Sequence, residues 1–72
     1  MRNKSLEKYI YEIGTRGCSI KIHTDFTPFR DSYMLIYVAI IHNKNKKQIG
    51  FIQETNINNF VNAIGRYVKG LK

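Results

Sequence analysis

The residue types of a nucleophilic hydrolase occur together in one stretch of the chain, as Ser19, His23 and Asp25. Apolar and polar residues alternate from Cys18 to Phe26, which predicts a half-buried strand with these three side chains on its polar face. Four strand residues at about 3.3 Å each would separate Ser19 from His23 by about 13 Å, far beyond the reach that base-assisted attack requires. The spacing therefore argues against a local catalytic triad.

Metal chemistry finds equally little support. Cys18, His23 and His42 form no short Cys-x-x-Cys or His-x-x-x-His pair that would preorganise a site, so a buried structural thiol and two surface histidines are favoured. The five acidic residues are scattered over different segments: Glu7, Glu12, Asp25, Asp31 and Glu54. A paired-carboxylate site or a magnesium site needs them together. We therefore expect a protein that is not an enzyme and has no metal, cofactor or small-molecule substrate.

The basic residues point to binding instead. Twelve Lys and Arg against five Asp and Glu give a net charge of +7 in 72 residues, which attracts polyanions or acidic protein surfaces at long range. Lys44, Lys46 and Lys47 form the tightest cluster, on a predicted turn where three cations can contact successive phosphates. Three more cations would extend this patch if the fold brings them alongside: Arg16, Lys21 and Arg30. The alternative is a solvated surface that only keeps the protein soluble.

Periodicity predicts the elements that position these residues. Apolar residues at helical spacing begin at Leu6 and recur from Ile57, and Asn3 or Ser5 and Thr55 or Asn56 are suitable N-caps. Between them lie three predicted strands, a loop and a turn: strand 18–26, loop 27–32, strand 33–42, turn 43–47 and strand 48–54. Gly50 is expected to mark a bulge or a close approach. The prediction is an α+β fold in one domain, residues 1–72, with the order α-β-β-β-α.

The central strand, residues 33–42, is apolar on both faces. If both helices pack on one face of the sheet, the other face is left uncovered, and soluble monomers seldom expose such a stripe. We expect the uncovered face to form a homodimer interface or a partner-binding platform through four residues: Tyr33, Leu35, Tyr37 and Ile41. The alternative is that the helices straddle the sheet, or that the first helix wraps around it. Phe29, Tyr33 and Tyr37 also offer stacking faces for unpaired bases.

Segments that would direct the chain out of the cytoplasm are not predicted. The chain does not open on a basic segment followed by an apolar one, and the longest apolar run, 33–41, is far below the roughly 20 residues that span a bilayer. The single cysteine, Cys18, makes no internal disulfide. We therefore expect a cytoplasmic protein without membrane contacts.

Two families share the predicted layout. The α-β-β-β-α order resembles the double-stranded RNA-binding domain, although that family carries a lysine cluster at the start of its last helix, where this chain has Asn56, Ile57, Asn58 and Asn59. It also carries a Gly-Pro and His pattern in its first hairpin loop, which residues 27–32 lack.

Small phage-encoded anti-CRISPR proteins provide a second resemblance. The run Ile10, Tyr11, Glu12, Ile13, followed by Ser19, Ile20, Lys21, Ile22, is similar to the opening of a compact inhibitor of a type II-A effector nuclease. The resemblance implies a non-enzymatic protein that blocks a nucleic-acid site on the effector. That inhibitor is acidic whereas this chain carries +7, which implies binding to guide RNA, target nucleic acid or an acidic patch.

Together these observations predict a small basic binding protein of phage or mobile-element origin, which engages nucleic acid or a nucleoprotein. The alternative is a protein-directed inhibitor of a host defence nuclease, or a homodimeric assembly module that uses the exposed sheet face.

Overall fold

The computed structural model describes residues 3–71, and it has the predicted order of elements. These are α1 (Lys4–Thr15), β1 (Ser19–Phe29), β2 (Ser32–His42), β3 (Gln48–Glu54) and α2 (Ile57–Gly70). The strands form one antiparallel sheet in the order β1-β2-β3. The structure thus confirms the predicted α+β class and the α-β-β-β-α order.

An asparagine side chain caps the N-terminus of each helix, and each is one of the two residues predicted for that position. The Oδ1 atom of Asn3 accepts a hydrogen bond from the backbone N–H of Leu6, and that of Asn56 accepts from Asn58 and Asn59. Such caps satisfy N–H groups that have no partner within the first helical turn. They fix where each helix starts relative to the sheet.

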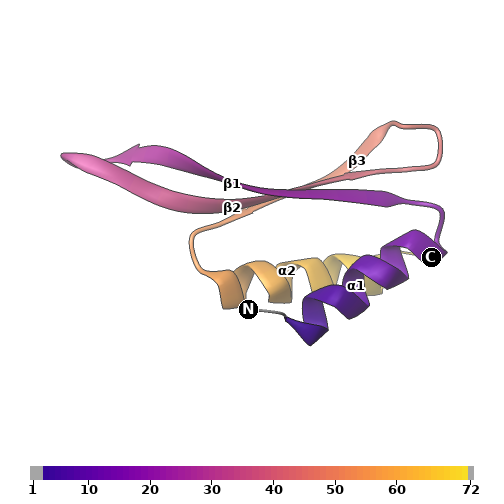
Figure 1. Cartoon of the computed structure of the whole chain (residues 1–72). Coiled ribbons are helices and arrows are strands. Elements are labelled where there is room, and N and C mark those ends of the chain that lie inside the picture. Colours follow the sequence, from indigo (N-terminus) through magenta and orange to yellow (C-terminus); the bar gives the residue numbers. More distant parts are fainter. Residues whose placement is uncertain (1–2, 72) are drawn as a thin grey trace.

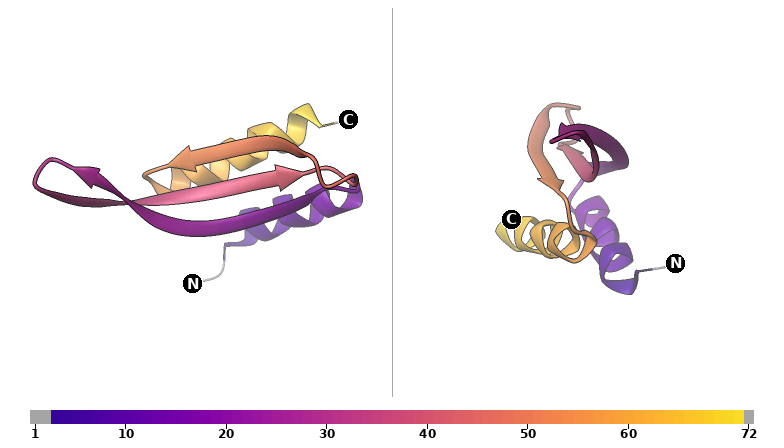
Figure 2. Two further views of the ribbon diagram at one scale, coloured as in Figure 1. Left: turned by 90° about the horizontal axis from the view of Figure 1, so that it is seen from above. Right: turned by 90° about the vertical axis from the view of Figure 1, so that its left-hand side faces the viewer.

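Both helices lie side by side on one face of the sheet (Figure 1), and no described helix covers the other, which we call the open face. The hairpin of β1 and β2 is longer than the helices and extends beyond them (Figure 2). We call this extension, residues 25–36, the arm. It contributes to the elongated outline of the molecule, which measures 42 × 26 × 19 Å.

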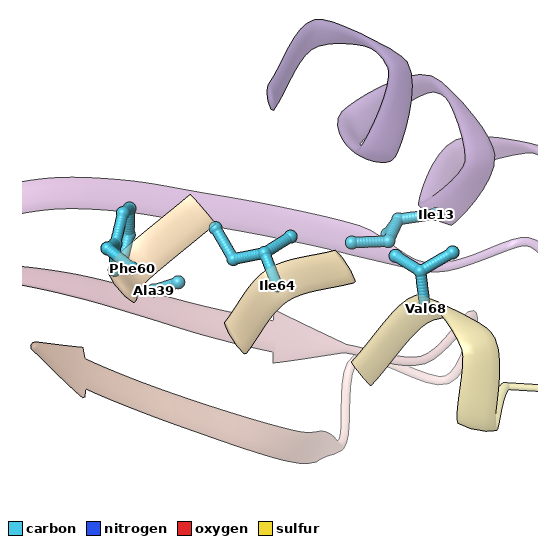
Figure 3. Packing of buried hydrophobic residues seen from close by; sticks show 5 residues of the cluster. All are labelled: Ile13, Ala39, Phe60, Ile64 and Val68. Carbon is cyan, nitrogen blue, oxygen red and sulfur yellow. The ribbon is translucent and has the colours of Figure 1, made fainter. Parts of the chain in front are cut away.

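The core lies between the helices and the covered face of the sheet (Figure 3). Its fully or almost fully buried centre is made of Ile13, Ala39, Phe60, Ile64 and Val68. The Tyr37 ring lies 5.7 Å from that of Phe60, and Ile41 is fully buried. The expectation that Tyr37 and Ile41 belong to the uncovered face is therefore wrong, because their side of β2 is the side on which the helices pack.

The open face carries the other set of β2 side chains, Met34, Ile36, Val38 and Ile40. Ile36 and Val38 nevertheless expose only 7% and 5% of their surface. The register places His23 and Gln53 on either side of Val38, and directly opposed residues of antiparallel strands share a face. Side chains of the flanking strands therefore shield much of the apolar stripe that β2 presents on the open face.

The predicted loop over residues 27–32 is mostly strand. Phe29 pairs with Ser32, which leaves only Arg30 and Asp31 in the turn. Pro28 is accommodated because β1 is an edge strand, where a missing N–H group need not break a ladder. Arg30 takes a positive φ of 56°, a conformation more usual for glycine at the first position of a tight hairpin turn.

Gly50 allows α2 to approach β3 closely, as predicted. A Cβ at Gly50 would lie 2.8 Å from ring atoms of Tyr67, and the Tyr67 hydroxyl donates a hydrogen bond of 3.0 Å to the carbonyl of Ile49. The pairing with β2 also shifts register here, between Ile41 and His42. Burial raises the pKa of Tyr67 above its usual value, and Cys18 raises it further.

Candidate nucleic-acid interface

The turn between β2 and β3 holds its three lysines in a defined arrangement. The Asn43 Oδ1 atom accepts hydrogen bonds from the backbone N–H groups of Asn45 and Lys47, at 2.9 and 3.0 Å. Two backbone bonds close the turn, from Asn43 N to Lys47 O and from Lys46 N to Asn43 O. Lys46 takes a positive φ of 64°, which Asn and Gly adopt more readily. The turn therefore presents its lysines from a well-ordered backbone.

Residues from three segments meet beside this turn on the open face. Ser19, at the start of β1, pairs with His42, at the end of β2. These two residues, with Lys21 and Lys46, line an open hollow of about 370 Å³. A serine hydroxyl, a histidine N–H and two ammonium groups all donate hydrogen bonds, and two of these donors carry a full positive charge. The hollow therefore suits a phosphate group.

Further cations lie at the same end of the molecule. The turn before β1 abuts the lysine turn, because the Cβ position of Gly17 lies 3.9 Å from the Cβ of Lys44. The Arg16 guanidinium in this turn donates a 2.9 Å hydrogen bond to the Glu12 carbonyl, which fixes its place at the end of α1. The last turn of α2, with Lys69, ends on this side too (Figure 1). We call this end the basic pole, and it comprises six cations: Arg16, Lys21, Lys44, Lys46, Lys47 and Lys69.

The structure thus brings together five of the six predicted binding cations, and Arg30 is the exception. Arg30 lies at the tip of the arm, at the opposite end of the long hairpin, with its guanidinium 5.2 Å from the centre of the Phe29 ring. The prediction that it extends the patch is wrong because β1 continues to Phe29 and carries the turn away from the pole. Asp25 and Asp31 lie on the arm as well, so the positive charge is concentrated at one end.

Comparison with known proteins identifies no family for this chain. No protein-family model matches the chain, and no curated protein or solved structure matches it significantly.

Among residues 3–71, no group of three or more His, Cys, Asp or Glu side chains is placed to hold a metal ion. Within that range, too, no helix has the length and apolar character needed to cross a membrane. Cys18 is half-buried against the core without a disulfide partner.

The predicted stacking aromatics lie away from the basic pole. Tyr37 packs on Phe60 in the interior, while Tyr33 and Phe29 are exposed on the arm. Phe51, which the sequence analysis passed over, exposes 56% of its surface. It pairs with Ile40, and Ile40 pairs with Lys21 on its other side, so these three side chains share the open face. The sequence alone did not single out Phe51, because only one of two successive strand residues can face the core, and either Phe51 or Ile52 could be that residue.

Proposed function

We propose that this chain is a non-enzymatic protein that binds nucleic acid, or the nucleic acid of a nucleoprotein complex, through phosphate contacts at the basic pole. The observation that carries the proposal is the hollow lined by Ser19, Lys21, His42 and Lys46. No carboxylate is among the residues that line it. A phosphate there would meet donors alone, without a like charge that repels it.

A polyanion suits the pole better than a single small anion. Lys44 and Lys47 lie on the same turn as Lys46, and Arg16 lies on the adjoining turn. These cations spread over more surface than one phosphate can contact. A chain of phosphates at regular intervals would engage several of them at once, and each contact releases a condensed counterion.

The experiment is a binding titration of the purified protein against a short duplex and a single strand, followed by fluorescence anisotropy at several salt concentrations. With four to six phosphate contacts, we expect log K to fall with log[salt] with a slope of about −4 to −5 for duplex DNA and about −3 to −4 for a single strand. Absence of binding at about 50 mM salt, or a slope near zero, would contradict the proposal.

The proposal also covers the cellular location and the origin of the protein. A cytoplasmic location suits the unbridged, half-buried thiol of Cys18, because reducing compartments keep thiols unpaired. The proposal of a phage or mobile-element origin is supported by the resemblance of residues 10–13 and 19–22 to anti-CRISPR proteins. An effector nuclease with its guide RNA would offer a polyanion of the required kind.

A second function, self-association through the arm, is favoured by a separate observation. Phe26 and Tyr33 expose 65% and 71% of their surfaces, and they lie with Leu35 on the covered-side face of the arm, beyond the helices. Aromatic side chains bury about 150–250 Å² each, so the exposed parts of Phe26 and Tyr33 would supply about a third of the roughly 800 Å² per partner in a standard interface, and Leu35 adds to this area. Asp25, Arg30 and Asp31 leave the arm almost neutral, so two copies can meet there with their basic poles far apart.

Sedimentation velocity tests the second function. We expect wild-type protein to shift from monomer to dimer as its concentration rises into the submillimolar range, and Tyr33→Asp to remain monomeric because it buries an unpaired charge at the contact. Tyr11→Asp, which changes an exposed tyrosine on α1, is the matched control and should dimerise normally. A wild-type chain that stays monomeric throughout would rule out this function.

A further inference from the structure

Phe51 places an exposed aromatic ring on the open face next to the basic pole. It lies in line with Ile40 and Lys21 across the three strands. Lys21 itself lines the phosphate-sized hollow. Two strand spacings, about 10 Å, separate Phe51 from Lys21, which is comparable with the size of one nucleotide. The ring and the hollow can therefore contact the base and the phosphate of the same strand.

The exposure of Phe51 has no structural explanation within the fold. Its neighbour Ile52 packs against the core from the covered face. Phe51 shares the open face with Ile40, and no described helix covers that face. The other phenylalanines lie elsewhere: Phe60 is in the core, and Phe26 and Phe29 are on the arm. Among residues 3–71, Phe51 is thus the aromatic side chain on the open face of the three-stranded part of the sheet.

We propose that the basic pole selects single-stranded nucleic acid by stacking an unpaired base on the ring of Phe51. This inference rests on the proposed function and names its substrate class. Bases in a duplex are already stacked and paired, so their faces are closed to the ring. Bases in a single strand can turn out and stack on an aromatic side chain over a sheet, while cations beside the sheet hold the backbone.

Stacking on the ring of Phe51 would supply affinity that the phosphate contacts do not supply. Phosphate contacts at Lys21 and Lys46 would be made with either form of nucleic acid. Base–aromatic stacking would be made with the single strand alone, and its loss on alanine substitution lowers affinity about 5- to 150-fold. A stacked base brings no net charge, so the salt slope depends only on the cations.

The experiment compares Phe51→Ala with wild type on an oligothymidylate strand and on a duplex of equal length, at one salt concentration. We expect single-strand affinity to fall by about 5- to 150-fold, and duplex affinity to change by less than about twofold. Phe51→Tyr should keep single-strand binding because it keeps a stacking face. Tyr11→Ala, which removes an exposed aromatic from α1, is the matched control and should bind both probes as wild type does.

The outcomes separate the two proposals. If wild type binds neither probe at low salt, the proposed function fails. If wild type binds both and Phe51→Ala weakens both equally, or weakens neither, the basic pole stands and the stacking inference fails. A circular dichroism spectrum of each variant, unchanged from wild type, shows that the comparison is between folded proteins.

Discussion

Replacing the three turn lysines together, as Lys44→Gln, Lys46→Asn and Lys47→Gln, is expected to weaken nucleic-acid binding by about 100- to 1000-fold at about 50 mM salt. Each lysine that contacts a phosphate contributes about 0.9 to the salt slope for duplex DNA, so the slope should become shallower by nearly three. Asparagine is chosen at position 46 because the backbone there has a φ of 64°, which asparagine tolerates well. Anisotropy titrations of wild type and variant give both quantities.

A matched variant separates local contacts from total charge. Lys4→Gln, Lys8→Gln and Arg30→Gln also lower the net charge of +7 by three, but these residues lie along α1 and at the tip of the arm, outside the basic pole. We expect a loss of only a few-fold from the weaker long-range field. Equal losses in the two variants would mean that charge acts without a defined site, and would contradict the basic pole as the interface.

Phe60→Ala is expected to lower the free energy of unfolding by about 3–5 kcal/mol. The side chain is fully buried and packs on Tyr37 at the covered face of the sheet, so its removal leaves a cavity between α2 and β2. Domains of this size have a net stability of only a few kcal/mol. The variant should therefore be largely unfolded at room temperature. Chemical denaturation followed by circular dichroism measures the loss.

Phe51→Ala provides the comparison for the stability measurement. It removes the same ring from an exposed position on β3, where little burial is lost, and we expect a change below about 1 kcal/mol. If both variants lost the same stability, Phe51 would be a core residue. Its role as a surface for stacking would then be untenable.

The order of elements could be predicted because each segment has a clear period. Residues 18–26 alternate, and residues 57–71 repeat at helical spacing. The extent of the arm could not be predicted, because Pro28 and its polar neighbours have the composition of a loop. Cross-strand pairing extends both strands through this segment, since Phe26 pairs with Leu35 and Phe29 with Ser32. An edge strand accommodates the proline.

The choice of covered face was misjudged for a different reason. Both faces of β2 are apolar, so β2 alone does not determine which face the helices cover. The neighbouring strands do: Ile20 pairs with Ile41, Ile22 with Ala39, and Ala39 with Ile52. Only that face is apolar on all three strands. The alternation in residues 18–26 already contained this information, because antiparallel pairing transfers the face of one strand to the next.

The charged residues of the candidate site could be predicted from the sequence, but its aromatic residue, Phe51, could not. Lys44, Lys46 and Lys47 are adjacent in the sequence, so any turn keeps them together. Their association with Lys21 depends on the register of Ser19 with His42, which becomes visible only in the folded sheet. Phe51 was missed because either Phe51 or Ile52 could face inward, and the close approach of Tyr67 to Gly50 fixes that choice.

The position of α2 has a consequence for how the protein forms as it is synthesised. Three of the five central core residues, Phe60, Ile64 and Val68, come from this helix, which is the last element along the described chain. The strands leave the ribosome earlier, with nothing to cover their apolar face except α1. Folding of this domain can therefore be completed only after α2 has emerged, and until then the apolar face of the sheet lacks most of its cover.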